Sequence, residues 1–139
     1  MQIRSMSDVV HNRRPLTLPG SATVQEACGL MRQHRVGAVL VITADRTLEG
    51  IFTGRDAVRL LAEGENAAQT QLHAVMTRDP ATLSPRHNAM DALRLMQDGG
   101  FRHVPVVEMG KVVSIASIGD FRAFEHARLD EETGYWERI

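Results

Sequence analysis

Apolar residues recur with a helical period in the first third of the chain. They occupy one face of the segment 24–31 at i, i+3, i+4 and i+7 spacing, which is typical of a helix packed on a core. The positions on this face are Val24, Ala27, Cys28 and Met31. Thr23 and Glu26 form a capping-box pattern at the start of this helix. Residues 16–18, which precede the cap, predict a brief extended stretch.

Two apolar runs follow the first helix. Residues 38–42 are apolar without interruption and predict a buried strand. The polar residues 43–47 predict a turn, and 48–52 predict the strand that returns from it. Thr53 then predicts the start of a second helix that ends near Gly64, because glycine is common just beyond a helix C-terminus.

The same order of elements occurs a second time. Residues 15–18 match residues 80–83 at an offset of 65 (80 − 15), with the proline, the threonine and the second leucine identical. The elements predicted for the second copy are a helix from Asn88 to Gly99–Gly100, a hairpin of 103–107 and 112–116, and a last helix from Ser117. A duplicated unit predicts a pseudo-symmetric fold, with any site between the two copies.

Each copy follows the order β-α-β-β-α, so the predicted fold class is α+β, with two pseudo-symmetric repeats packed sheet to sheet. A single core of fewer than about 70–80 residues contributes little net stability, which favours one core shared by both repeats. The predicted divisions are 6–64 for the first repeat, 65–72 for a polar linker, 73–126 for the second repeat and 127–139 for a C-terminal tail.

The composition narrows the class of protein. Of the 139 residues 43% are hydrophobic but only 4% are aromatic, so the core must be aliphatic. The net charge of −1 provides no field that would attract nucleic acid or an anionic membrane, and we expect neither as a partner. No apolar stretch reaches the ~20 residues that cross a bilayer. A single cysteine, Cys28, and no signal-peptide pattern favour a cytoplasmic protein.

Two helix starts carry the candidate chemistry. Thr53 with Asp56, and Ser117 with Asp120, each place a hydroxyl at a strand end and a carboxylate three residues later. The unpaired N–H groups of a helix N-terminus suit a phosphate, and the carboxylate could accept hydrogen bonds from a ribose diol. The alternative is an ordinary capping pattern, because acidic residues favour the first helical turn for dipole reasons alone.

The start of the second copy's hairpin adds donors and an unusual proline. Arg102 and His103 could donate to a phosphate, although a solvated polar patch is the alternative interpretation. Pro105 lies early in an apolar strand, where a missing N–H is tolerated chiefly at a strand start or edge. We expect this edge to leave backbone groups free for a planar base.

Other residue patterns point to no further chemistry. The histidines have no zinc-ligand spacing, so we expect no metal site. Cys28 lies on the apolar helix face and is interpreted as a small core residue. No nucleophile–base pair or catalytic carboxylate pair is present, so we expect no enzyme and no catalytic residue. Tyr135 and Trp136 in the tail are expected to dock on the protein's own dimer, with a partner protein as the alternative.

Taken together, these motifs resemble the CBS domain, named for cystathionine beta-synthase, and residues 6–126 resemble a tandem pair, the Bateman module. The matching segments are 6–7 and 76–77 at the openings, 50–56, 102–106 and 117–120. The resemblance implies a regulatory module that binds adenosine nucleotides in clefts between the repeats, signals to an unknown protein partner, and forms a homodimer. AMP is the expected ligand, with ADP, ATP, NAD or S-adenosylmethionine as alternatives.

The resemblance also implies two clefts. Cleft A would use Thr53, Arg55, Asp56, Thr82, Arg102, His103, Val104 and Pro105. Cleft B would use Thr17, Val36, Gly37, Ala38, Ser117 and Asp120. Cleft B has Gly37 and Ala38 where cleft A has Arg102 and His103, so we expect the phosphate site in cleft A. The alternative function is a dimeric protein-interaction scaffold in which both clefts are vestigial.

Overall fold

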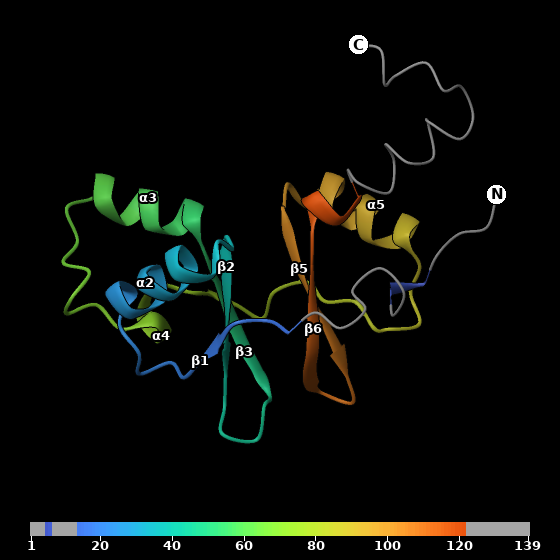
Figure 1. The fold of residues 1–139 in the computed structure, drawn as a ribbon, viewed down its shortest axis with the longest axis horizontal. Coiled ribbons are helices and arrows are strands. Elements are labelled where there is room, and N and C mark those ends of the chain that lie inside the picture. Colours follow the sequence, from blue (N-terminus) through green and yellow to red (C-terminus); the bar gives the residue numbers. More distant parts are fainter. Residues whose placement is uncertain (1–4, 7–13, 122–139) are drawn as a thin grey trace, which may run out of the picture.

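The computed structural model describes residues 5–6 and 14–121, and its elements follow the predicted order (Figure 1). The first repeat contains β1 (Thr17–Leu18), α2 (Val24–His34), β2 (Ala38–Ile42), β3 (Leu48–Thr53) and α3 (Gly54–Ala62). The rest of the chain contains α4 (Leu72–Val75), β4 (Thr77–Arg78), α5 (Ala89–Gly99), β5 (His103–Glu108) and β6 (Lys111–Ser117). A last helix begins directly after Ser117, as predicted.

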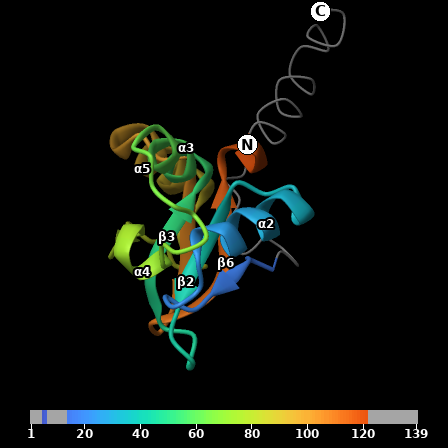
Figure 2. The same cartoon turned by 90° about the vertical axis from the view of Figure 1, so that its left-hand side faces the viewer.

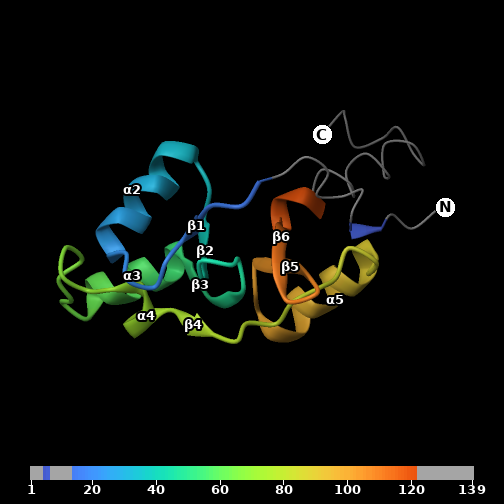
Figure 3. The ribbon, with the colours of Figure 1, turned by 90° about the horizontal axis from the view of Figure 1, so that it is seen from below.

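Two sheets face each other in the middle of the molecule, with helices on their outer sides (Figure 1). One sheet has the order β1-β2-β3-β4 and the other is the antiparallel pair β5-β6. Seen from below, α3 and α5 lie on one side of the molecule, while α2 and the helix after β6 lie on the other (Figure 3). Figure 2 shows α3 and α5 along the same upper edge. The α+β class and the two-repeat architecture are confirmed.

The sheets pack through aliphatic side chains of both hairpins. The residues of this interface are Ala38, Leu40, Ile42, Leu48, Ile51, Val112 and Ile115. At the hairpin tips the two repeats also pair directly, since Val112 N–H donates to the Arg46 carbonyl over 3.1 Å. The Lys111 ammonium lies 2.7 Å from the Asp45 carboxylate in the same place. The predicted sheet-to-sheet packing therefore combines an apolar centre with a hydrogen bond and an ion pair at the hairpin tips.

Capping residues explain where the helices begin. In α3 and α5 the box is complete, because Thr53 and Asn88 each exchange two hydrogen bonds with the aspartate three residues later. At α2 the predicted box is only half correct. The Thr23 hydroxyl accepts from Glu26 N–H over 3.1 Å, but the Thr23 N–H does not donate to the Glu26 carboxylate. The Glu26 side chain remains exposed, where water competes for it.

The two repeats exchange their opening segments. Met6 opens the first repeat in sequence but is fully buried in the core of the second, with Leu83 and Met96. Its N–H donates to the His87 carbonyl over 2.7 Å. Met76 opens the second repeat in sequence but packs into the core of the first. Each opening therefore completes the core of the other repeat, which sequence order alone does not reveal.

The segment that the sequence predicts as a polar linker, 65–72, is tied to the first repeat. Leu72 is fully buried, and its N–H donates to the Ala22 carbonyl over 2.8 Å. Val24 N–H donates to the Thr70 carbonyl over 2.9 Å, which satisfies one of the first N–H groups of α2. β4 then pairs with β3 against Gly50, where an added Cβ would lie 2.7 Å from the Thr77 carbonyl oxygen. Glycine is needed at position 50 for this close approach.

Candidate ligand-binding cavity between the repeats

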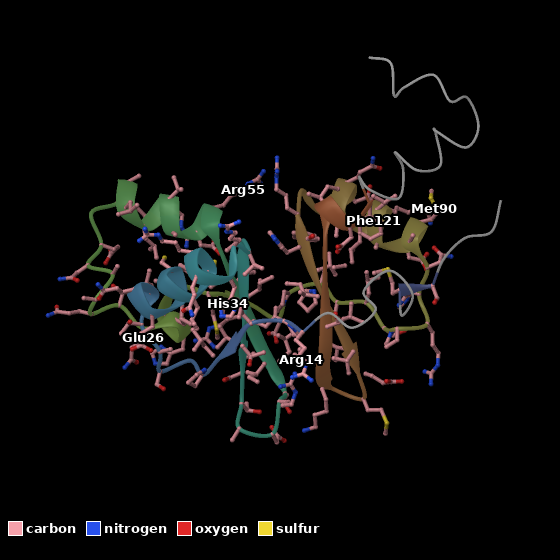
Figure 4. The ribbon with its side chains drawn as sticks, in the orientation of Figure 1. Arg14, Glu26, His34, Arg55, Met90 and Phe121 are labelled. Atoms are coloured by element: carbon pink, nitrogen blue, oxygen red, sulfur yellow. The ribbon has the colours of Figure 1, made fainter. Side chains whose placement is uncertain are left out.

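A cavity of about 490 Å³ lies where the N-terminus of α3 approaches the C-terminus of α5. Both repeats line it. From the first repeat come Gly37, Ile51, Thr53, Gly54, Arg55 and Asp56. From β4 and beyond come Thr77, Asp79, Pro80, Ala81, Gly100, Phe101, Arg102 and His103. In Figure 4 the Arg55 side chain lies above the junction between the two repeats.

The start of α3 forms one wall of this cavity. Thr53 N–H donates to Asp56 Oδ2 over 2.9 Å, and the Thr53 hydroxyl donates to the same oxygen over 3.1 Å. Asp56 N–H returns a bond to the Thr53 hydroxyl oxygen over 3.4 Å. The second carboxylate oxygen, Oδ1, lies 3.8 Å from the Arg59 guanidinium. The capping interpretation is therefore correct, and it holds the carboxylate in a fixed orientation on the cavity wall.

Arg102 and His103 form the facing wall from the start of β5. The Arg102 carbonyl accepts from Ile118 N–H over 2.9 Å, which fixes the backbone beside the last helix. The His103 imidazole packs on Gly37, where an added Cβ would lie 3.2 Å from Cε1. Burial and the charge of Arg102 lower the pKa of His103, while the charge of Asp120 opposes them. The wall therefore holds a guanidinium beside a partly buried imidazole that favours its neutral form.

The lowered pKa of His103 predicts a loss of stability in mild acid. A histidine whose folded pKa is lowered binds protons more readily in the unfolded state, so its contribution is complete above the unfolded pKa of about 6.5 and declines below it. The free energy of unfolding should therefore decrease from pH 7.5 to pH 5.5, and His103→Gln should reduce this decrease. Urea unfolding at both pH values measures it. The exposed His34→Gln variant is the control, and an unchanged slope in His103→Gln would refute the assignment.

Pro105 has a different effect from the one predicted. It is fully buried and its carbonyl accepts from Leu83 N–H over 3.0 Å, so the strand edge at Pro105 itself is occupied. At the equivalent position of the first repeat, Leu40 N–H donates to the Leu16 carbonyl over 2.8 Å. Pro105 has no N–H, so the corresponding carbonyl, that of Ala81, receives no such bond. Among the backbone N–H groups of the described ranges, none donates to the Ala81 carbonyl, and Ala81 lines the cavity.

The structure brings together most of the residues predicted for cleft A. Those that line the cavity are Thr53, Arg55, Asp56, Arg102 and His103. Val104 and Pro105 do not, because both are buried in the second repeat. Thr82 is exposed and also lies outside the lining. Successive side chains of an extended segment point to opposite sides, which explains why Ala81 lines the cavity and Thr82 does not. Ligand contact at these positions stays a prediction.

The residues predicted for cleft B are arranged differently. Ser117 N–H donates to Asp120 Oδ2 over 2.8 Å, so the helix start repeats the geometry of α3. Gly37, however, lines the same cavity as Arg102 and His103. Of the other predicted positions, Ala38 is buried, Thr17 is half-buried and Val36 is exposed. Gly37 thus lies under the His103 ring between the two repeats, and its assignment to cleft B stays a prediction.

Several lining residues were missed by the sequence analysis. They are Ile51, Gly54, Thr77, Asp79, Pro80, Ala81, Gly100 and Phe101. For Ala81 a signal was available, because the repeat aligns it with Leu16 and aligns Pro105 with Leu40. Asp79 adopts a positive φ of 46°, which no residue pattern in the sequence indicates.

The sequence also led to expectations about membrane spans, metal sites, Cys28 and the C-terminal tail. No helix in 14–121 is long and apolar enough to cross a membrane. Within the described ranges no group of three potential metal-ligating side chains comes together. Burial raises the pKa of the Cys28 thiol, which fits its position on the α2 core face. The tail with Tyr135 and Trp136 lies outside the described residues.

Comparisons with known proteins identify the same two repeats. The family model of the CBS domain matches residues 6–63 and 72–126. The CBS domain-containing protein CBSCBSPB3 of Arabidopsis thaliana is 42% identical over 106 residues, which are 76% of this chain but only 19% of that protein. The chain thus spans about a fifth of the length of this plant relative. The CBS domain-containing protein YhcV of Bacillus subtilis is 36% identical over 105 residues, 75% of this chain and 74% of that protein.

Solved structures share the arrangement of the two repeats. The CBS domain protein PAE2072 from Pyrobaculum aerophilum, complexed with AMP, superposes with a TM-score of 0.78 at 25% identity. The match covers 84% of this chain and 88% of that one. With the family model matching both repeats and relatives above 30% identity, this chain belongs to the CBS domain family.

Proposed function

We propose that this chain is a regulatory module that binds an adenosine nucleotide, with AMP as the first candidate, in the cavity between its repeats. One observation carries the proposal. The N-terminus of a helix with an oriented carboxylate, Asp56, faces the basic side chains Arg102 and His103 across a cavity that both repeats line. The AMP complex of the related PAE2072 supports the choice of ligand.

Each part of AMP has a matching group in this arrangement. The positive end of the α3 helix dipole, with the Arg55 and Arg102 guanidinium groups, suits the phosphate. The Asp56 carboxylate suits the ribose diol, since a charged acceptor makes strong hydrogen bonds to hydroxyls. The Ala81 carbonyl, which lacks the strand N–H donor that Leu40 provides to Leu16 in the first repeat, suits the exocyclic amine of adenine. Because these groups come from both repeats, a bound nucleotide would change how the repeats are held together.

The direct test is the melting temperature of the protein with AMP, ATP and NAD. A ligand that binds only the folded state stabilises it by about 2.7 kcal/mol at 100 times its dissociation constant. We expect AMP to raise the melting temperature without being consumed, as suits a sensor that is not an enzyme. No shift with any nucleotide would favour the scaffold with vestigial clefts, and turnover of a nucleotide would favour an enzyme.

We also propose that the module acts as a homodimer. Val58 and Leu61 of α3 are 66% and 73% exposed, which is unusual for apolar side chains three residues apart on one helix. Met90 of α5 lies on the same upper side of the molecule in Figure 4. Phe121 does not contribute to this surface, because it is buried in the core of the second repeat.

Leu61→Arg is expected to convert the dimer to a monomer. A charged side chain in an apolar interface loses its water without gaining a partner, which outweighs the small area that each leucine contributes. Sedimentation at micromolar concentration measures the change. The control is Met109→Arg, because Met109 is exposed at the far end of the hairpin of β5 and β6. A wild-type monomer at this concentration would contradict the proposal.

A further inference from the structure

One aromatic side chain of the described region is not in the core. Phe52 and Phe121 are at most 1% exposed, but Phe101 is 40% exposed. Phe101 also lines the cavity between the repeats. Since aromatic residues are only 4% of this chain and the others described are fully buried, the exposed ring is unusual.

The neighbouring Gly99 allows the ring to lie where it does. A Cβ at position 99 would lie 2.2 Å from Cε2 and 2.5 Å from Cζ of Phe101, so the ring occupies the space of the missing side chain. Gly99 is not needed for the backbone, because the left-handed residue that ends α5 is Gly100, with φ of 72°. Glycine inside a helix weakens it relative to alanine. Gly99 therefore weakens α5, and in return it leaves the space that the Phe101 ring occupies.

The backbone around the ring is held from both repeats. Phe101 N–H donates to the Met96 carbonyl over 3.0 Å, which continues the C-terminal cap of α5. The Arg55 guanidinium, from the start of α3 in the first repeat, lies 3.5 Å from the Gly100 carbonyl. The ring thus stands at the point where the two walls of the cavity meet.

We propose that Phe101 is an aromatic platform on which the planar ring of the bound ligand packs, which makes it a specificity-determining residue of the cavity. The inference rests on the proposed nucleotide binding. Stacking on an aromatic ring accepts any base, because every base has a π-face. Phe101 would therefore select ligands that carry a heteroaromatic ring, and the Ala81 carbonyl would select among the bases.

The test compares AMP with ribose 5-phosphate, which shares its sugar and phosphate but has no base. Phe101→Ala should weaken AMP binding by about tenfold or more and change ribose 5-phosphate binding by less than about twofold. Phe101→Tyr should keep the affinity for AMP. Phe101→Leu, which is apolar but not aromatic, should lose most of it. Calorimetry gives the affinities, and melting without ligand confirms that each variant folds.

Two glycine variants test the platform without changing the ring itself. Gly99→Ala should displace the Phe101 ring and weaken AMP binding severalfold, again without affecting ribose 5-phosphate. Gly29→Ala is the matched control, because Gly29 also lies inside a helix and its added Cβ would meet no atom within 4 Å. AMP binding by Gly29→Ala should equal that of the wild type.

The outcomes separate this inference from the proposed function. Wild-type protein that does not bind AMP would overturn both. Wild-type protein that binds AMP, with Phe101→Leu equal to it, would overturn the platform alone. Parallel losses of AMP and ribose 5-phosphate in Phe101→Ala would also overturn it, because they would indicate a general distortion of the cavity.

Discussion

Asp56→Ala is expected to weaken AMP binding by about ten- to hundredfold. A hydrogen bond to a charged group contributes about 1.5–3 kcal/mol, and each 1.4 kcal/mol is a factor of about ten in affinity. The Asp56 carboxylate lines the cavity, and hydrogen bonds from the Thr53 N–H and hydroxyl hold it in one orientation. Calorimetry with AMP measures the loss.

Asp56 also caps α3, so the variant needs a control for the cap itself. Asp91 forms the same box with Asn88 at the start of α5, with both bonds at 2.9 Å. It lies at the end of α5 that is remote from the cavity. Asp91→Ala should lose a similar stability, about 0.3–1 kcal/mol, and keep the affinity for AMP. An equal loss of affinity in both variants would show that Asp56 acts only through the fold.

Asp120→Ala separates the two clefts. We expect it to weaken AMP binding less than Asp56→Ala, because the lining of the cavity includes Asp56 and not Asp120. The sequence leads to the same expectation, because cleft A has Arg102 and His103 where cleft B has Gly37 and Ala38. A larger loss in Asp120→Ala would place the nucleotide in cleft B instead.

Met6→Ala is expected to lower the free energy of unfolding by about 2–5 kcal/mol, the usual range for truncating a buried methionine. The affected region should be the second repeat, since Met6 packs there beside Leu83 and Met96. Urea unfolding measures the size of the effect, and hydrogen exchange locates it. Amide protection should fall first in α5, β5 and β6, and much less in α2 and β2.

Met109→Ala is the control for Met6→Ala. Met109 is 94% exposed, so its truncation should change the stability by no more than about 0.5 kcal/mol. Loss of protection that began in α2 and β2 of Met6→Ala would contradict the exchange of openings between the repeats.

Local patterns in the sequence were sufficient to predict the elements. The apolar run 38–42 became β2 with the same bounds, and α5 ends at Gly99 as its glycine pair indicated. These features depend on neighbouring residues, whose periodicity is visible in one chain. The exchange of Met6 and Met76 depends on contacts between segments far apart, and apolar periodicity does not say which core receives a side chain.

The same distinction applies to the cavity. Thr53 and Asp56 could be predicted because a capping box is a local pattern with a fixed spacing. The contact of the His103 ring with Gly37 and that of the Phe101 ring with Gly99 could not be predicted, because neither follows from a pattern of residue types along the chain. The Ala81 carbonyl lies between these cases, since it follows from comparing Pro105 with Leu40 once the parallel pairing of β1 and β2 is known.

The exchanged openings set an order for folding during synthesis. When α3 has left the ribosome, the core of the first repeat still lacks Leu72 and Met76, which are made later. The first repeat therefore cannot close until the chain through β4 has emerged. Burial of the Met6 side chain is delayed further, because the core into which it packs includes Phe121. Of the buried residues that the structure describes, Met6 is the first to be synthesised and among the last to be buried. A ribosome stalled before residue 121 would hold a nascent chain with its Met6 side chain still exposed.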